Sequence, residues 1–167
     1  MPYQQIAEHQ YYYGSRIVKL MNIEIRKAAI EDAAIIAPLF DSYRSFYKQA
    51  SDVEGAFNFI KERLEQNESV IFIAFIKENA VGFVQLYPVF TSVGMKRAWL
   101  LNDLYIHVSS RGKGVATALL NAAKEFGQTT DSKWLMLQTA ADNYTAQALY
   151  KKNGWKKETD LFYRFDL

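Results

Sequence analysis

The stretch from Ser109 to Leu120, SSRGKGVATALL, places two glycines and two basic residues between a run with a strand pattern and a run with a helix pattern. Glycines at such a junction let backbone N–H groups converge on one point, and the N-terminus of the following helix adds a positive dipole there. A tight turn with basic residues for solubility has the same composition. The turn taken alone therefore leaves a phosphate site and a structural turn both open.

Two familiar phosphate-binding motifs do not fit this turn. A P-loop needs a glycine five residues before its Gly-Lys pair, where His107 stands, and a Ser or Thr after the lysine, where Gly114 stands. A dinucleotide fingerprint needs a third glycine at the position of Thr117 and normally follows the first strand of its fold. The chain is therefore expected to be neither a P-loop nor a Rossmann protein.

Apolar periodicity predicts strands and helices in mixed order. Strands are expected in 21–28, 69–76, 81–90, 97–108 and 133–139, with a closing pair of strands in 155–167. Helices are expected in 28–47, 52–66, 115–126 and 143–153, the last with Gly154 as its C-cap. Their expected inward residues are Ile35, Leu39, Tyr43, Phe46, Phe57, Ile60, Leu64, Leu119, Leu120 and Ala123. The predicted fold class is α/β, with a central mixed, mostly antiparallel sheet and helices on both faces.

Composition bounds the domain count and the partners. A chain of 167 residues, half of them apolar, can bury one sizeable core, so we expect one domain over 21–167, preceded by a tyrosine-rich extension over 1–20. The net charge of +2 comes from interspersed charges, which predicts no nucleic-acid partner. The absence of cysteine excludes disulfides, thiolate metal sites and a cysteine nucleophile, and no metal site is expected. Without an apolar run of membrane-spanning length or a signal-peptide pattern, the expected location is the cytoplasm, with no membrane partner.

Two sequence motifs carry a resemblance to a known family. Arg111-Gly-Lys-Gly114-Val-Ala116 resembles the acetyl-CoA loop of the GNAT family of N-acetyltransferases, whose consensus is Gln/Arg-x-x-Gly-x-Gly/Ala, and NYTAQALYKKNGW, from Asn143 to Trp155, resembles its second signature. The resemblance runs from about Ile23 to the end of the chain and is nearest to the histone and polyamine acetyltransferases. It implies an acetyl-CoA-dependent acetyl transfer to an amine and a splay between the two central strands.

The resemblance also implies which residues bind the acetyl donor, acetyl-CoA. The backbone N–H groups of the loop and the Thr117 hydroxyl would hold the pyrophosphate, and the backbone of Ile106 and Val108 would bind the pantetheine arm as an added strand would. Asn143 matches a position that contacts the same arm. The implied cofactor-binding residues are Ile106, Val108, Arg111, Gly112, Lys113, Gly114, Val115, Ala116, Thr117 and Asn143.

Two residues are the catalytic candidates. Tyr150 matches the tyrosine that protonates the departing thiolate, a role that suits a phenol with a reference pKa of ~10. Asp103 is the first candidate for the base that deprotonates the amine, and His107 ranks below it. Asn102 stands where polyamine acetyltransferases often have a glutamate, which weakens a polyamine assignment. A bulge in this strand would let a backbone N–H near Ile106 meet the oxyanion.

The first two helices and the loop after the central hairpin strand are expected to select the acceptor, which is a small molecule, a peptide or a protein. Each of their aromatic and acidic side chains is equally explained as a core or surface residue. The candidates are Tyr43, Phe46, Tyr47, Tyr87 and Trp99 for an aromatic slot and Asp41, Asp52 and Glu54 for attraction of a basic amine.

Two questions stay open at the level of sequence. A sensor that binds acyl-CoA without turnover would need the same glycine loop, so it is the alternative function. The aromatic tail DLFYRFDL, residues 160–167, suits either a homodimer interface or an ordinary edge hairpin.

Overall fold

A computed structural model describes residues 22–167 of the chain. Its sheet has five strands in the order β1-β2-β3-β4-β5, with antiparallel neighbours except for the parallel pair β4–β5. The strands are β1 (Ile23–Lys27), β2 (Val70–Ile76), β3 (Asn79–Thr91), β4 (Lys96–Ile106) and β5 (Leu135–Leu137). The helices are α1 (Ala33–Phe46), α2 (Val53–Glu65), α3 (Val115–Thr129) and α4 (Tyr144–Lys152), with short 3-10 turns at Ile30–Asp32 and Val108–Ser110.

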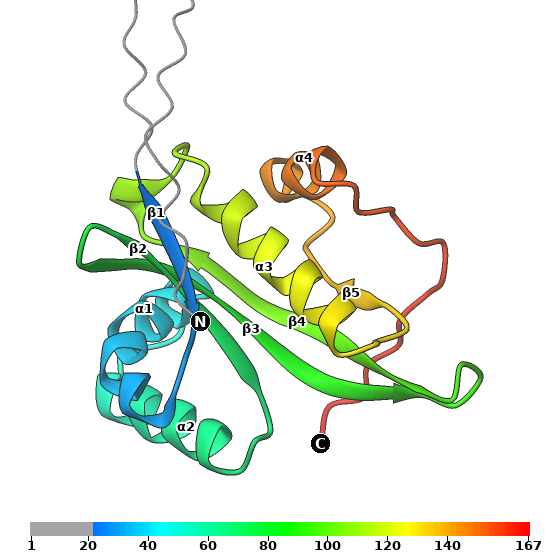
Figure 1. The fold of residues 1–167 in the computed structure, drawn as a ribbon, viewed down its shortest axis with the longest axis horizontal. Helices are drawn as coiled ribbons and strands as arrows, with labels where there is room; N and C mark the ends of the chain where they lie inside the picture. Colours follow the sequence, from blue (N-terminus) through cyan, green and yellow to red (C-terminus); the bar gives the residue numbers. More distant parts are fainter. Residues whose placement is uncertain (1–21) are drawn as a thin grey trace, which may run out of the picture.

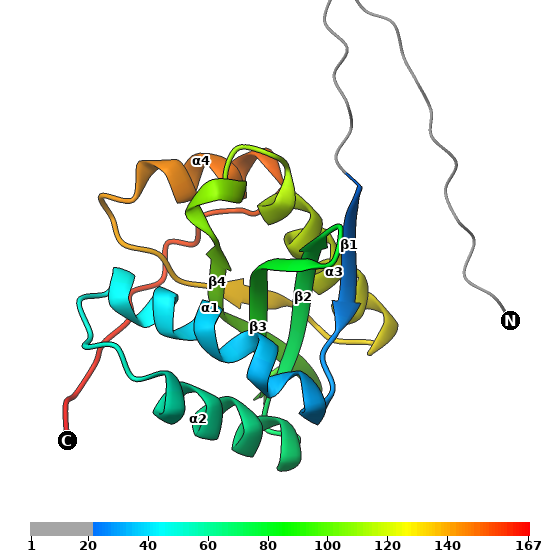
Figure 2. The same ribbon diagram turned by 90° about the vertical axis from the view of Figure 1, so that its left-hand side faces the viewer.

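The helices cover both faces of the sheet, as the sequence predicts (Figures 1 and 2). On one face, α1 and α2 enclose a core that includes Ile36, Phe40, Ile60, Ile73 and Phe83. On the other face, α3 packs on the sheet, and α4 lies beside it. The second core includes Leu86, Trp99, Leu101, Leu119 and Leu120. The predicted inward residues of α3 are confirmed, because Leu119, Leu120 and Ala123 are fully buried.

The buried stripe of α1 differs from the predicted one. Ile35 and Phe46, both expected to face the core, are 41% and 60% exposed, whereas Ile36 and Phe40 are buried. Two adjacent isoleucines allow either phase of a helical stripe, and contact with the sheet selects the phase with Ile36 inward.

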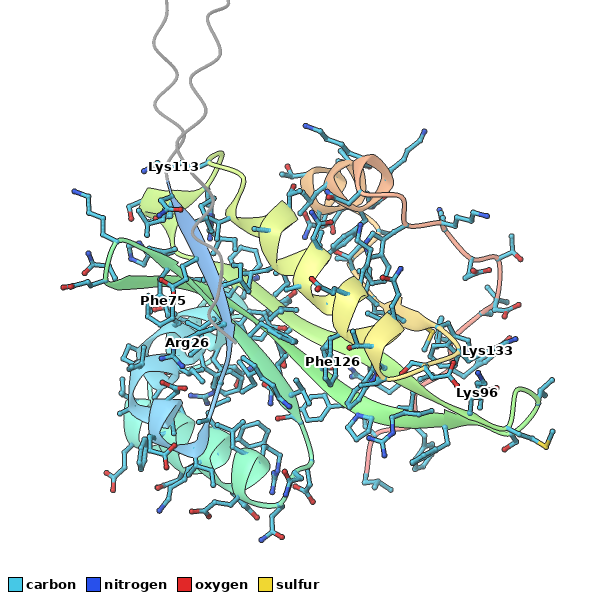
Figure 3. The ribbon with its side chains drawn as sticks, in the orientation of Figure 1. Arg26, Phe75, Lys96, Lys113, Phe126 and Lys133 are labelled. Carbon is cyan, nitrogen blue, oxygen red and sulfur yellow. The ribbon has the colours of Figure 1, made fainter. Side chains whose placement is uncertain are left out.

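Hydrogen-bonded carboxylates tie the first helices together. Asp32 accepts from both terminal nitrogens of Arg26 at 2.6 Å, and the Arg26 guanidinium lies 5.0 Å from the centre of the Phe75 ring (Figure 3). Asp41 on α1 accepts from the Ser51 hydroxyl and the Asp52 N–H, both at 2.7 Å. These bonds fix the loop between α1 and α2 against the end of α1.

The predicted closing pair of strands is wrong. Residues 155–167 form neither strand nor helix, and the side chains of Leu161, Tyr163 and Phe165 are 77–90% exposed. An alternating pattern becomes a strand only where a neighbouring edge supplies hydrogen bonds, and in the described chain the sheet ends at the three-residue strand β5. The expected extension over 1–20 lies outside the described residues. No helix within 22–167 is long and apolar enough to cross a membrane.

Candidate active site

The turn between β4 and α3 has the backbone geometry of an anion-binding loop. Gly112 and Gly114 adopt left-handed φ angles of 72° and 86°, which cost a residue with a side chain about 1–2 kcal/mol. A Cβ atom at Gly112 would meet no atom within 4 Å, so the loop surface is open there. Gly114 is the N-cap of α3 and no side chain caps this helix. The first N–H groups of α3 are thus left for a ligand, and the loop fits a diphosphate.

The basic side chains of this turn lie at its rim. Arg111 Nε donates to the Ile106 carbonyl at 3.1 Å, and Lys113 Nζ donates to the Ser109 carbonyl at 2.7 Å. Figure 3 shows Lys113 at the outer end of the turn. His107 Nδ1 lies 2.8 Å from the Ser109 hydroxyl, so the exposed imidazole stabilises the turn. The loop therefore brings two positive charges next to its free N–H groups.

Strand β4 separates from β5 just below this loop. Their pairing covers only Trp99–Leu101 of β4, which continues for five more residues to Ile106. His107 donates its N–H to Val81 on β3, and because N–H directions alternate along a strand, the N–H of Ile106 points toward the gap. The predicted splay is confirmed, and its β4 edge offers unpaired backbone groups to an extended ligand.

The predicted strand 97–108 ends two residues early. Val108 begins a 3-10 turn and its carbonyl accepts from the N–H of Arg111 at 3.4 Å. The bonds within this turn compete with continuation of the strand. Val108 thus lies at the junction of the splay and the loop, not on the strand edge where the sequence places it.

A β-bulge at Asn102 decides where Asp103 lies. In the β3–β4 ladder Leu86 pairs with Leu101 and Gln85 with Asp103, so Asn102 is the extra residue. Without it, period-two alternation would put Asp103 on the α3 face together with Leu101. The bulge instead turns Asp103 to the α1/α2 face at the start of the splay. A bulge, which the sequence argument requires for an oxyanion-binding N–H near Ile106, is therefore present four residues upstream of Ile106.

Asp103 is a buried carboxyl group surrounded by phenols. Asp103 is 4% exposed, and this burial raises the pKa of its carboxyl group. Hydrogen bonds from Asn102 Nδ2, at 3.1 Å, and from the Tyr43 hydroxyl lower the pKa and oppose the effect of burial. Burial, and next the Asp103 charge, raises the pKa of Tyr43. The same two causes raise the pKa of Tyr87 to about 12. Both phenols stay protonated at neutral pH beside one carboxylate, an arrangement suited to holding an ammonium group.

Tyr150 lies on α4, and its surroundings include the α3 core and Tyr47. It is half-buried against the α3 core on α4, and its ring centre is 6.3 Å from that of Trp155. Burial raises the pKa of Tyr150, and the charge of Tyr47, at the end of α1, raises it further. Figure 2 shows the C-terminal end of α1 and the start of α4 on the same side of the molecule. A phenol with a raised pKa keeps its proton until a strongly basic group forms nearby, as a general acid must.

Asn143 and Thr117 hold the ends of these helices. Asn143 Oδ1 caps α4 by accepting from the Ala146 N–H at 3.2 Å, and its backbone N–H donates to the Ala140 carbonyl at 3.0 Å. The side-chain NH₂ group is the donor of Asn143 that these two bonds leave available to a ligand. The Thr117 hydroxyl accepts from Asn153 Nδ2 at 3.4 Å, which links α3 to the end of α4. The C-cap predicted at Gly154 lies one residue earlier, at Asn153, and Gly154 follows it in the left-handed conformation with a φ of 83°.

The predicted aromatic slot assembles in part. Tyr43 and Tyr87 flank Asp103, and Tyr47 lies edge-on to Tyr43 with ring centres 5.1 Å apart. Phe46 is exposed beside Tyr47. Trp99 is 2% exposed in the α3 core, where its indole donates to Thr130, so it does not line a slot.

The acids expected to attract a basic acceptor have other roles. Asp41 is buried in the bonds that close the loop between α1 and α2, and Asp52 caps α2 by accepting from the Gly55 N–H at 2.8 Å. Glu54 is exposed. Two of the three acids, Asp41 and Asp52, are therefore held in structural hydrogen bonds around the loop between α1 and α2.

One residue that sequence analysis missed pairs with Asp103 across the β3–β4 ladder. Gln85 is fully buried, and its Nε2 donates to the Ser69 hydroxyl at 2.8 Å, while Oε1 has no hydrogen-bond partner within the described residues. A glutamine on the buried face of a strand is the one signal that could have found it. No group of three or more His, Asp or Glu side chains in 22–167 is arranged to hold a metal ion.

Comparison with known proteins defines the class. The family model described as "Acetyltransferase (GNAT) family" matches residues 36–155. An uncharacterized N-acetyltransferase of Bacillus subtilis, YhfO, is 50% identical over 137 residues, which are 82% of this chain and 92% of that protein. The crystal structure of a probable acetyltransferase superposes with a TM-score of 0.79 at 37% identity, covering 86% of this chain and 96% of that one.

A third comparison concerns the fold alone. An aminoglycoside N-acetyltransferase in complex with CoA has a TM-score of 0.72 at 19% identity, covering 87% of this chain and 96% of that one. Taken together, the comparisons show that the chain belongs to the GNAT family. It is an N-acetyltransferase, and acetyl-CoA is its acetyl donor.

Proposed function

We propose that the protein transfers the acetyl group of acetyl-CoA directly to a primary amine of a small molecule, a peptide or a protein, with Asp103 as base and Tyr150 as acid. The observation that carries the proposal is the bulge at Asn102, which turns a buried carboxyl group to the α1/α2 face where the β4–β5 splay begins. The donor would approach along the unpaired edge of β4 from the α3 loop. The amine would approach between Tyr43 and Tyr87.

The reaction needs three proton movements. An alkylammonium has a pKa of ~10.4 and must lose a proton before its nitrogen can attack the thioester carbon. In this proposal, that proton goes to Asp103 directly or through one water. The new C–N bond forms, the C–S bond breaks, and the sulfur takes a proton from the Tyr150 hydroxyl. The second proton of the attacking nitrogen then returns to the Tyr150 phenolate through water, which gives the neutral amide and restores Tyr150.

The donor would be held by the loop and the splay. The N–H groups from Arg111 to Ala116, with the rim charges of Arg111 and Lys113, would bind the pyrophosphate. Ile106 would offer its N–H to the pantetheine arm, with Val108 at the junction, and Thr117 and Asn143 would complete the site. Support comes from the two left-handed glycines and the uncapped start of α3.

The test is thiol release from acetyl-CoA across a panel of primary amines, with CoA binding measured in parallel. Tyr150→Phe should slow turnover by about 10²-fold or more and leave CoA affinity within twofold. Tyr144→Phe is the matched control on the same helix, because Tyr144 is 75% exposed, and it should keep wild-type turnover. Wild-type turnover in Tyr150→Phe would contradict the acid role.

Two further variants separate the base from the donor site. Asp103→Asn keeps the shape of the carboxyl group and should lower turnover by about 10²-fold without changing CoA affinity. Gly114→Glu puts a side chain and a negative charge where the phosphates would bind, and it should abolish CoA binding. Unchanged CoA affinity in Gly114→Glu would remove the loop from the donor site.

The proposal also covers the domain bounds, the location and the oligomeric state of the protein. Residues 21–167 would form the catalytic domain, with 1–20 as an extension, and the enzyme would act in the cytoplasm. Two copies would associate through the exposed apolar tail, which includes Leu161, Phe162 and Phe165. A sedimentation mass of one chain at micromolar concentration would contradict the dimer, and recovery in a membrane or secreted fraction would contradict the location.

A further inference from the structure

Gln85 carries a hydrogen-bond acceptor that has no partner deep inside the protein. The residue is fully buried on β3, and its amide oxygen Oε1 has no hydrogen-bond partner within the described residues. Its amide nitrogen Nε2, by contrast, donates to the Ser69 hydroxyl at 2.8 Å. Buried polar groups in proteins are nearly always paired, because an unpaired one lowers stability. We therefore looked for a partner that Oε1 gains in another state of the site.

The sheet register places Gln85 opposite Asp103. The two residues are direct partners in the β3–β4 ladder, so their side chains point to the same face with Cβ atoms about 5 Å apart. That face is the one covered by α1 and α2, because Phe83 and Tyr105, two residues away on each strand, both pack in the core beneath these helices. Gln85 and Asp103 thus lie side by side in one buried layer.

The bond to Ser69 orients the amide of Gln85. Ser69 directly precedes β2, whereas Asp103 belongs to β4, so the two residues lie on opposite sides of β3. The oxygen and the nitrogen of an amide diverge from one carbon atom, and here the nitrogen points to the β2 side. The oxygen is therefore the polar atom that Gln85 offers to the β4 side.

The charge state of Asp103 explains why this oxygen is unpaired. An ionised carboxylate only accepts hydrogen bonds, whereas a protonated carboxyl group has one O–H to donate. Asn102 Nδ2 and the Tyr43 hydroxyl already donate to the carboxylate. Two acceptors cannot bond to each other, but Gln85 Oε1 can accept as soon as Asp103 carries a proton.

The ionisable groups around this pair do not offer a better acceptor. Those that face Asp103 or its phenol neighbours are Tyr43, Tyr47, Tyr87, Tyr105, Arg63 and Glu68. Burial raises the pKa of both Tyr43 and Tyr87, so these phenols keep their protons and act as donors toward the carboxylate. Arg63 and Glu68 form an ion pair and reach the cluster through Tyr87.

We propose that Gln85 is a positioning residue for the base, and that its Oε1 accepts the O–H of the protonated Asp103 carboxyl group. In the reaction proposed above, a carboxyl oxygen takes a proton from the ammonium group, and the new O–H at first points back to the amine nitrogen. Rotation about the C–O bond turns this O–H to Gln85, which leaves the lone pair of the nitrogen free to attack the thioester. The catalytic consequence rests on the proposed function, whereas the hydrogen bond itself does not.

The test is the pKa of Asp103, measured from the pH dependence of its carboxyl carbon resonance in NMR spectra of the full chain. The resonance is assigned by its absence in Asp103→Asn. A hydrogen bond to the neutral form of an acid raises the pKa. Gln85→Met removes Oε1 and keeps the length of the side chain, so it should lower the pKa of Asp103 by about one pH unit. The acid limb of kcat/KM should move by the same amount.

Three further variants separate this role from packing. Ser69→Ala removes the bond that orients the amide and should also lower the pKa of Asp103, so it tests the same contact if Gln85→Met does not fold. Asn102→Ala removes a donor to the carboxylate and should raise this pKa. Gln128→Met, at an exposed glutamine of α3, is the matched control and should leave it unchanged. A purely structural Gln85 would change the Tm without moving the pKa.

The outcomes separate this inference from the proposed function. An unchanged pKa of Asp103 in Gln85→Met and Ser69→Ala would overturn the inference. A raised pKa would also overturn it, because a water that donates to both groups would then stabilise the ionised form. A lowered pKa with an unmoved acid limb of kcat/KM would support the hydrogen bond and contradict Asp103 as the base. An unchanged pKa together with an acid limb that Asp103→Asn removes would support the base and overturn the inference.

Discussion

Gly82 on β3 approaches the backbone of β4 closely, and both the fold and the proposed donor site depend on this contact. It pairs with Ile106, the last residue of β4 before the glycine loop. A Cβ atom at Gly82 would lie 2.6 Å from the Tyr105 carbonyl oxygen and 2.9 Å from Ile106 Cδ1. The oxygen belongs to the backbone and cannot rotate away. Gly82→Ala therefore has to move the end of β4.

The size of the effect follows from this overlap. Ordinary contact begins at 3.4 Å, so the end of β4 has to move by up to 0.8 Å. Overpacking of this kind costs about 1–3 kcal/mol, and the lower entropy of alanine in the unfolded chain offsets roughly 0.5–1 kcal/mol. We expect a net loss of up to about 2.5 kcal/mol, which lowers the Tm by up to about 10 °C. Because a misplacement of about 1 Å can cost 10²-fold in rate, kcat/KM for acetyl-CoA should fall by about 10-fold to 100-fold.

The assay combines thermal unfolding with calorimetric CoA binding and acetyl-CoA kinetics. Gly94→Ala is the matched control, because a Cβ there would meet only the side chains of Thr91 and Lys133, at 2.9 and 3.3 Å, in the hairpin at the far end of β4. It should keep wild-type CoA affinity. A Gly82→Ala protein with wild-type Tm and wild-type CoA affinity would refute the argument that this close approach positions the loop.

Three more predictions follow from burial and charge. Leu120→Ala, at a fully buried position of α3, should cost about 2–5 kcal/mol of unfolding free energy, measured by urea titration. The hydrogen bonds from Arg26 lower the pKa of Asp32 below its ordinary value of 3.8. The ionised Asp32 therefore stabilises the fold above pH 3.8, and this contribution is lost as the pH falls through the lower pKa of the folded state. Asp32→Asn should destabilise the protein at pH 7 and reduce the loss of stability in acid. Burial raises the pKa of Asp103 above 3.8, so kcat/KM should fall as the pH decreases through that raised pKa. Asp103→Asn should remove this acid limb of the pH profile. An identical acid limb in the variant would show that another group titrates there.

The sequence by itself indicated the turn that is proposed to bind the donor. Two glycines between a strand and a helix predict a turn open to a ligand, and Gly112 and Gly114 both adopt the left-handed backbone that glycine takes most easily. The order of strands and helices also follows from local periodicity, since each pattern depends on residues near one another in the chain. The α3 face, with Leu119 and Leu120 inward, was predictable for the same reason.

Tertiary structure alone decided the side of the site that is proposed to bind the acceptor. Asp103 faces α1 and α2 because the extra residue Asn102 shifts the alternation of side chains along β4. Such a bulge depends on how β4 pairs with β3, which the local sequence does not encode. The same limit explains the tail, whose alternating pattern pairs with no strand within 22–167, and Trp99, whose aromatic character fits a slot or a core equally well. The surroundings of Asp103 come from α1, β3 and β4, three segments that meet only in the folded chain.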